Sequence, residues 1–329
     1  MNAIVQVATQ SQASVISAGR LRRQDFLEVL MRSATRTAAV TVLVLLGGVI
    51  LTLVHGSMPA FHQFGLGFFT TQTWNPVTDR YGALAAMYGT LLTSLIAMLI
   101  GIPVSFGVAI FITELCPAWL QRPISTAIEL LAGVPSIIFG IWGLFVLAPF
   151  LQAHVQPLVI SLFSGVPLLS DLFAGPPYGI GIFTAGIILS IMVLPYITAV
   201  TRDVFMTVPP VLKESAYGLG CTTWEVISNI VLPYTRVGVV GGIMLGLGRA
   251  LGETMAVTFV IGNAHRIGKS LLAPGTTISA TIANEFAEAT TDLYTSALVE
   301  LGLILFVITF LVLAAARFML LRMEMRGKK

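Results

Sequence analysis

The stretch Leu84-Ala-Ala-Met-Tyr-Gly-Thr-Leu-Leu-Thr-Ser-Leu-Ile-Ala-Met-Leu-Ile-Gly-Ile-Pro-Val-Ser-Phe-Gly-Val-Ala-Ile-Phe-Ile112 contains no charged residue. A helix needs about 20 predominantly apolar residues to cross the hydrocarbon core of a bilayer, so this stretch is long enough to span one. Similar stretches recur along the chain, and together they lie at 37–57, 84–112, 126–151, 179–201, 237–262 and 296–320. The sequence therefore predicts an all-α transmembrane protein with six spans.

The composition supports a membrane protein. Of the 329 residues, 56% are hydrophobic and 10% are charged, whereas soluble domains carry roughly 25% charged residues. The net charge of +3 does not indicate a nucleic-acid partner, because the basic residues are scattered between the apolar stretches and form no stripe. The partner that the composition predicts is membrane lipid.

The basic residues instead predict the topology, since Lys and Arg near span ends retain a segment in the cytoplasm. With a cytoplasmic N-terminus, Arg80, Arg266 and Lys269 fall outside. The inside segments hold Arg20, Arg22, Arg23, Arg32, Arg36, Arg122, Arg202, Lys213, Arg236, Arg317, Arg322, Arg326, Lys328 and Lys329. We therefore expect both termini to be cytoplasmic.

The expected domains follow from these spans. Residues 1–36 form a cytoplasmic leader with a possible interfacial helix, because Arg and apolar residues are mixed at 21–36. Residues 37–321 form the six-span domain, and 322–329 form a basic cytoplasmic tail. The first apolar stretch is longer than the roughly 7–15 residues of a signal-peptide core, so it is expected to remain uncleaved.

The longest cytoplasmic loop, at 207–235, carries the signals of two short helices joined by a bend. Pro209 or Pro210 suits a first helical turn. Gly220 suits the positive φ of a helix C-cap, and Thr222 with Glu225 fits a capping box that starts the second helix. Proline later in the loop is expected to end that second helix. From helix signals alone, an ordinary inter-span loop remains an alternative to a rigid docking unit.

The same loop holds a spaced set of residues, namely Glu214, Ser215, Ala216, Gly220, Ile230, Leu232 and Pro233. This set resembles the signature E-A-A-x3-G-x9-I-x-L-P of the permeases of ATP-binding-cassette (ABC) importers. Ser215 stands where alanine is usual, and serine is small enough to preserve the packing. The resemblance implies a type I importer permease whose loop docks onto an ATP-hydrolysing subunit through these residues.

Further segments resemble one branch of that family, the phosphate-specific permeases. They are Trp74-Asn-Pro76, Tyr88-Gly-Thr90, Glu129-Leu-Leu-Ala-Gly-Val-Pro-Ser-Ile-Ile-Phe-Gly140 and Gly248-Arg-Ala-Leu-Gly-Glu-Thr-Met255. The long leader and the extended segment between spans three and four look more like the PstC-type subunit than its PstA-type partner. The resemblance implies a multi-pass subunit of a bacterial inner (cytoplasmic) membrane that translocates inorganic phosphate. It also implies a homologous PstA-like permease, two PstB-like ATPases that hold the ATP and Mg, and a PstS-like phosphate-binding protein outside the membrane.

Arg249 and Glu253 are the candidate substrate-path residues, because charged residues inside a span usually face a partner, a bundle interior or a water-filled path. Their spacing of four places them on one helix face. A structural ion pair is one interpretation. In the other, the Arg249 guanidinium binds a passing oxyanion through its planar fork. Glu253 then limits the trapping of the anion and accepts a hydrogen bond from a protonated phosphate, which sulfate does not offer.

Three further features lead to weaker expectations. Gly238, Gly242 and Gly246 repeat every four residues and predict close helix packing, which suits an interface with a second permease. Glu129 and Glu300 lie near predicted span ends, so they are expected to be solvated or structural. The aromatic residues of 58–83 indicate either an aromatic belt at the membrane interface or a substrate gate; they are Phe61, Phe64, Phe68, Phe69, Trp74 and Tyr81.

The sequence lacks the motifs of nucleotide, metal and catalytic sites. Gly262-Asn-Ala-His-Arg-Ile-Gly-Lys-Ser270 has five residues between its glycines where a phosphate-binding P-loop has four, so the energy must come from a partner. No metal-site spacing and no catalytic constellation is found, so no cofactor bound by this chain and no enzymatic activity are expected. The alternatives left open are a permease for sulfate or molybdate, an ion-coupled transporter or channel, and an integral-membrane enzyme.

Overall fold

The structure is a computed structural model that describes residues 2–167 and 169–327, with side chains described for 24–167 and 169–322. These residues form helices and connecting loops, and no strand is found among them. Six helical segments are long and apolar enough to cross a membrane: Gln24–Phe64, Leu84–Leu115, Ser136–Phe163, Ile182–Met206, Thr223–Gly252 and Asp292–Arg322. The predicted all-α, six-span architecture is confirmed.

The chain divides into two compact units, residues 1–55 and 56–329. The backbone of the first unit is a single helix that belongs to α1 (Asn2–Phe64). From Asn2 on, the leader and the first span are therefore parts of one continuous helix, and the interfacial placement of 21–36 stays a prediction. The physical reason is that no proline precedes Pro59, so nothing in this segment forces the helix to stop.

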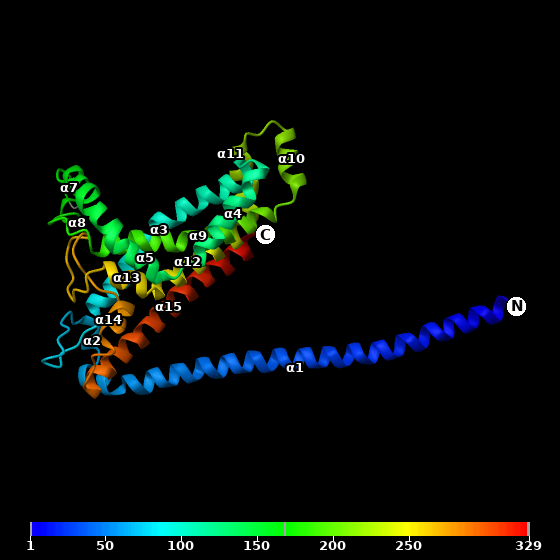
Figure 1. The fold of residues 1–329 in the computed structure, drawn as a ribbon, viewed down its shortest axis with the longest axis horizontal. Helices are drawn as coiled ribbons and strands as arrows, with labels where there is room; N and C mark the ends of the chain where they lie inside the picture. Colours follow the sequence, from blue (N-terminus) through cyan, green and yellow to red (C-terminus); the bar gives the residue numbers. More distant parts are fainter. Residues whose placement is uncertain (1, 168, 328–329) are drawn as a thin grey trace. The chain divides into compact units, whose positions relative to one another are not determined.

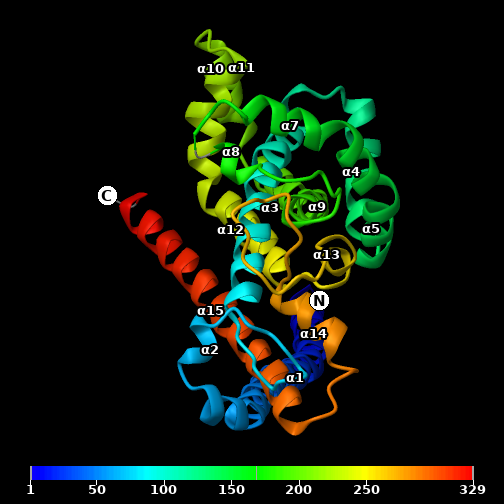
Figure 2. The same cartoon turned by 90° about the vertical axis from the view of Figure 1, so that its left-hand side faces the viewer.

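The second unit is built on α3 (Leu84–Ile110), α9 (Ile182–Met206) and α12 (Leu232–Gly252), and α9 packs against both of the others (Figures 1 and 2). Glycines allow this close packing. A Cβ atom on Gly246 would lie 2.6 Å from Ile197, and one on Gly238 would lie 2.6 Å from Val204. The predicted close packing is confirmed, and the helix packed against these glycines is α9 of the same chain.

Span three differs from the expected 126–151. An amphipathic helix α4 (Ala118–Ala132) ends at Gly133, and a new helix starts after Pro135. Proline disfavours a helical conformation in the residue before it, so the expected kink is a complete break. The span then runs through α5 (Ser136–Trp142), η2 (Gly143–Leu147), α6 (Ala148–Phe150), η3 (Leu151–Val155) and α7 (Gln156–Phe163), where η marks π-helical turns.

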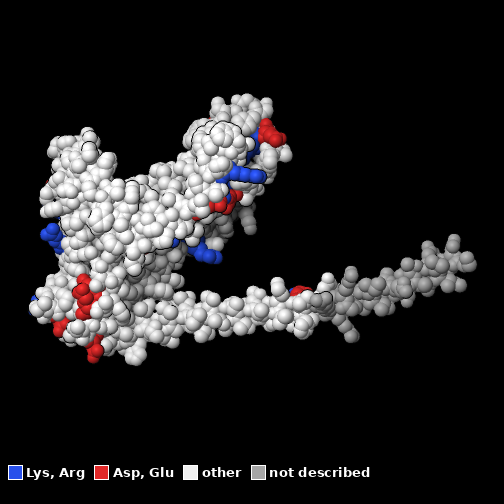
Figure 3. Space-filling view, viewed as in Figure 1, with Lys and Arg blue, Asp and Glu red and all other residues white. Residues whose placement is uncertain are grey.

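The remaining elements lie toward the two ends of the second unit (Figure 1). One end, here called the loop end, carries η1 (Phe111–Leu115), α10 (Pro210–Gly218), α11 (Thr223–Val226) and η4 (Ile227–Val231). The opposite end, here called the far end, carries α2 (Gly67–Thr70), α8 (Leu169–Leu172) and α14 (Ile278–Glu285), with α13 (Met255–Val260) leading toward it. On the face drawn in Figure 3, charged side chains gather toward these two ends, as expected for a unit that crosses a bilayer.

The last span, α15 (Asp292–Gly327), connects the two ends. It continues through most of the expected tail at 322–329, so that tail begins as a helical extension of the span. The side chains beyond 322 lie outside the described residues.

Candidate functional site

The loop at 207–235 forms from the local signals that predicted it. Helix α10 starts at Pro210, and Gly220 adopts a φ of +88°, which bends the chain after the helix ends. The Thr222 side chain accepts from the Glu225 backbone N–H at 3.4 Å, and the Glu225 carboxylate accepts from the Thr222 N–H at 2.8 Å. The predicted helix start, bend and capping box are confirmed.

The second short helix is not separate, contrary to the prediction. Helix α11 continues through the π-turn η4 into α12, so Thr223–Gly252 is one long helical segment. Pro233 sits in the first turn of α12, directly after the π-turn. In that turn the Leu232 N–H donates to the carbonyl of Ile227, five residues back. The wider turn accommodates the proline ring, which in a regular α-helix would clash with the carbonyl four residues back.

The candidate docking residues divide into a buried and an exposed set. Ala216 is buried in a cluster with Ala109, Phe205, Val226 and Val231 beneath the loop. A larger side chain at 216 would have to displace this packing. Ile230 and Leu232 are partly buried against the same cluster, while the other four are exposed: Glu214, Ser215, Gly220 and Pro233. The buried set supports the loop, and only the exposed set is available to a partner.

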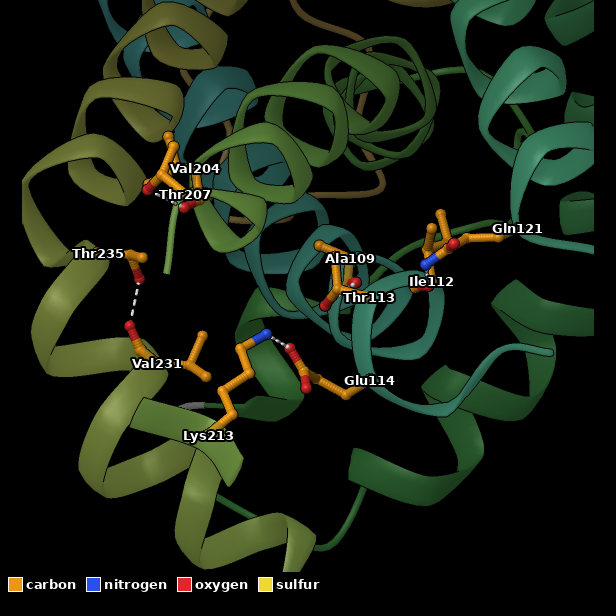
Figure 4. A network of polar contacts seen from close by, with 10 residues as sticks. All are labelled: Ala109, Ile112, Thr113, Glu114, Gln121, Val204, Thr207, Lys213, Val231 and Thr235. Atoms are coloured by element: carbon orange, nitrogen blue, oxygen red, sulfur yellow. Dashed lines mark hydrogen bonds and ion pairs between the residues drawn. The ribbon is translucent and has the colours of Figure 1, made fainter. Parts of the chain in front are cut away.

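An ion pair also fixes the loop. The Lys213 ammonium lies 2.5 Å from the Glu114 carboxylate at the end of span two, and the Glu114 side chain is only 6% exposed (Figure 4). Opposite charges attract more strongly where water is excluded. Helix α10 is therefore tied to span two as well as to spans four and five, which it joins in sequence. The pair could not be predicted, because no local sequence pattern connects the two positions.

Large apolar side chains on the loop face outward. Leu219 is 86% exposed and Trp224 is 67% exposed, and Val211 and Tyr217 are also exposed. Exposed apolar patches mark interaction sites, and aromatic residues are enriched in protein interfaces. The loop thus offers an apolar surface beside the exposed carboxylate of Glu214.

Arg249 lies on α12 and faces the ring of Tyr196 on α9. Its guanidinium carbon is 4.3 Å from the ring centroid, which is a cation–π contact. The Tyr196 hydroxyl donates to the carbonyl of Ala132 at 2.8 Å, where α4 breaks off from span three. The buried Nε of Arg249 has no hydrogen-bond partner among the described residues. No sequence pattern points to Tyr196.

Glu253 does not share a helix face with Arg249, so that prediction is wrong. Helix α12 ends at Gly252, and Glu253 is extended with φ −69° and ψ 128°. No ion pair joins the two residues within the described part of the chain. Gly252 accounts for the early end, because glycine destabilises a helix and allows the backbone to leave it.

A cavity of about 420 Å³ opens beside Arg249. Besides Arg249 and Tyr196, its lining includes Met244, Leu245 and Leu313. A cation in apolar surroundings, with an N–H that nothing accepts, favours an anionic ligand.

Comparisons with known proteins identify the family of this chain. Residues 101–325 match the model of the family described as binding-protein-dependent transport system inner membrane component. The chain belongs to this family. The phosphate transport system permease protein PstC of Mesorhizobium japonicum is 66% identical to this permease, and the match covers 93% of this chain and 94% of that relative. The protein of the same name from Pasteurella multocida is 57% identical, covering 92% and 95%.

Solved structures show the same fold at low identity. A methionine ABC transporter in an inward-facing conformation matches the permease with a TM-score of 0.54 at 16% identity, covering 72% of this chain and 94% of that one. A bacterial alginate ABC transporter, solved with an alginate-bound periplasmic protein, gives 0.54 at 20% identity, covering 85% and 93%.

Glu129 lies near a helix end as expected, and the permease uses it in an ion pair. Its carboxylate is 2.9 Å from the guanidinium of Arg202, which also pairs with Asp203 at 2.7 Å. Glu129 is 55% exposed while Arg202 is only 15% exposed. The pair connects α4 to α9 near the loop end, and it borders a cavity of about 520 Å³.

The aromatic residues of 58–83 are not a loose belt. Glu285 accepts hydrogen bonds from the Trp74 indole N–H and, at 2.6 Å, from the Tyr294 hydroxyl, and it contacts His265 Nε2 at 2.8 Å. Burial raises the pKa of Glu285, but these hydrogen bonds outweigh burial, and the pKa lies below its usual 4.5. Tyr81 is buried beside them, stacked on Tyr294. Trp74 and Tyr81 therefore belong to a packed polar cluster at the far end, and the belt and gate interpretations of the segment stay predictions.

Proposed function

We propose that this chain is a permease subunit that translocates inorganic phosphate across the inner membrane of a bacterium, driven by ATP hydrolysis in partner subunits. The single observation that carries the substrate is 66% identity, over 93% of the chain, to a phosphate transport system permease. The cavity at Arg249 supports an anionic substrate independently of that identity.

The proposed assembly has one site of energy input. A PstA-like permease completes the path, and two PstB-like ATPases hold ATP and Mg. A PstS-like binding protein delivers phosphate at the far end. The loop end is cytoplasmic in this proposal, as are both termini, and the chain itself is non-catalytic. Docking uses the exposed set of Glu214, Ser215, Gly220 and Pro233 together with the apolar surface around Trp224.

The loop is suited to transmit movement because it is fixed from three sides. The Lys213–Glu114 pair holds it to span two, and the buried cluster around Ala216 holds it to spans four and five. A displacement of α10 by an ATPase subunit therefore displaces packed helices rather than flexible loop. Packed interfaces change between discrete arrangements, which suits a switch between inward and outward access.

Within the path, Arg249 donates N–H groups to two phosphate oxygens, and Tyr196 holds the guanidinium plane through its ring. Glu253 has no ion pair with Arg249, so its carboxylate is available to accept a hydrogen bond from a protonated phosphate oxygen. That acceptor would discriminate against sulfate, which carries no proton at neutral pH.

The test is ATP-dependent uptake of labelled phosphate into vesicles reconstituted with the whole complex, with and without this subunit. Uptake that requires the subunit, and that excess sulfate or molybdate does not inhibit, supports the proposal. Uptake of phosphate without the subunit contradicts it. Stronger inhibition by sulfate or molybdate than by unlabelled phosphate assigns the path to another oxyanion.

A further inference from the structure

Glu300 is an acid buried inside the last span. The residue is only 2% exposed, and neither carboxylate oxygen has a hydrogen-bond partner among the described residues. Of the two expectations for Glu300, solvated or structural, the solvated one is therefore wrong. Acids within spans almost always pair with another group or face a polar cavity. Glu300 does neither in the described part of this chain.

The space beside Glu300 is a cavity of about 320 Å³ with almost entirely apolar walls. It lies between α15 and the end of α1 within the second unit, and Phe61, Val307 and Leu311 form its exposed rim. Either lipid tails or the apolar surface of another protein can cover the apolar rim. The Glu300 carboxyl, by contrast, requires a polar partner, because a buried polar group without a hydrogen bond is costly even when it is neutral, and a nearby cation would favour its charged form.

The depth of Glu300 argues against a lipid headgroup as the donor. Helix α15 starts at Asp292, so Glu300 lies about 12 Å along the helix at 1.5 Å per residue. Half of the hydrocarbon core is about 15 Å thick, and lipid amines stay at its surface. A long basic side chain on a neighbouring helix reaches this depth, as intramembrane charges that pair with one another do.

We propose that this cavity receives a basic side chain of a second permease subunit, which completes the hydrogen bonds of Glu300 when the two subunits assemble. The inference rests on the two-permease assembly proposed above. It assigns the face formed by Phe61, Val307 and Leu311 to that interface, and it makes Glu300 a specificity residue for the pairing.

The experiment compares Glu300→Leu with the natural chain in two measurements. Leucine is about the size of glutamate and removes the unpaired acid, so the chain expressed without its partners keeps or raises its thermal unfolding midpoint. In the full complex, leucine leaves the partner's basic group buried and unpaired, so the second permease copurifies at least about 100-fold more weakly. A role confined to this chain predicts the reverse: a lower midpoint and unchanged assembly.

Glu288→Leu is the matched control, because it makes the same change at an exposed position outside the spans. It is expected to leave both measurements unchanged. Normal copurification of the second permease with the Glu300→Leu chain overturns the inference, including the case in which a lipid or a proton satisfies the acid. Phosphate uptake by the natural complex, measured in the same preparation, reports separately on the proposed function.

A charge reversal tests the chemistry of the partner. Glu300→Lys brings two cations together and is expected to abolish assembly. Suppressors selected in the second permease should replace one basic intramembrane residue by an acidic one. Suppressors that instead lie only in this chain, or that restore assembly by enlarging apolar side chains, contradict a basic partner.

Discussion

The loop at 207–235 and the Arg249 site were both selected from sequence, but the structure confirms more of the loop prediction than of the Arg249 prediction. Three local signals of the loop, namely a proline start, a glycine bend and a capping box, are found where they were predicted, whereas the helix end expected at Pro233 is not. The Arg249–Glu253 pair rested on helical continuity across Gly252, and the helix ends there. The start, bend and capping signals act on adjacent residues and are present in the fold. The Arg249–Glu253 contact was inferred from helical spacing, so it required a helix that continues past Gly252.

Arg249 gives the largest expected effect. Arg249→Gln removes charge-assisted hydrogen bonds to the anion, worth about 1.5–3 kcal/mol, so uptake of labelled phosphate should fall roughly 10- to 150-fold at unchanged protein level. Tyr196→Leu should weaken uptake less, by up to about 30-fold, since a desolvated cation–π contact is worth about 2 kcal/mol.

Arg322→Gln is the matched control for this change, because Arg322 also faces a ring, that of Phe318 at 4.4 Å, but does not line the cavity. It should transport normally. Normal uptake by both Arg249→Gln and Glu253→Gln would contradict a substrate-path role for these two residues. The predictions for the loop would be unaffected.

Gly220→Val tests whether the bend couples ATP hydrolysis to transport. A side chain at 220 meets no atom within 4 Å, but the φ of +88° is strained for valine, at a cost of about 1–2 kcal/mol. Phosphate transported per ATP hydrolysed should fall about 5- to 30-fold. Gly218→Val, in equally open space but with an ordinary helical φ, should keep the ratio.

The Lys213–Glu114 pair should give a smaller effect on coupling. Lys213→Met leaves a nearly buried carboxylate unpaired, so both the transport ratio and the unfolding midpoint should fall, the ratio by about fivefold. Glu114→Gln combined with Lys213→Met should be milder than Lys213→Met alone. An exchange, Lys213→Glu with Glu114→Lys, should restore much of the ratio; no recovery would mean that the pair only fills space.

The far-end cluster should give the smallest effect, seen in the pH dependence of stability. The pKa of Glu285 is lowered by folding from 4.5, so the unfolded chain takes up the proton first as the pH falls. The stabilisation from Glu285 is complete above about pH 4.5 and is lost as the pH drops through the folded pKa. Glu285→Gln should flatten the fall of the unfolding midpoint below pH 4.5, and an unchanged profile would show that other acids dominate.

The apolar spans and the loop could be predicted because both depend on neighbouring residues. The bounds of span three were predicted wrongly. Residues 126–151 are apolar enough to read as one helix, but Pro135 divides them, and the span extends to Phe163 instead. Residues 152–163 contain many apolar side chains, but the turn-forming residues near them favour a loop over a helix.

The sequence by itself determined that this chain has six apolar helices long enough to cross a membrane, and where the loop at 207–235 starts, bends and is capped. Length, hydropathy and backbone preference are properties of short segments, so they can be read without the fold. Only the tertiary structure decided which side chains meet: Tyr196 with Arg249, Lys213 with Glu114, and Glu300 with nothing in the described chain. Such contacts join helices distant in sequence, and they depend on how the helices pack and where each one breaks.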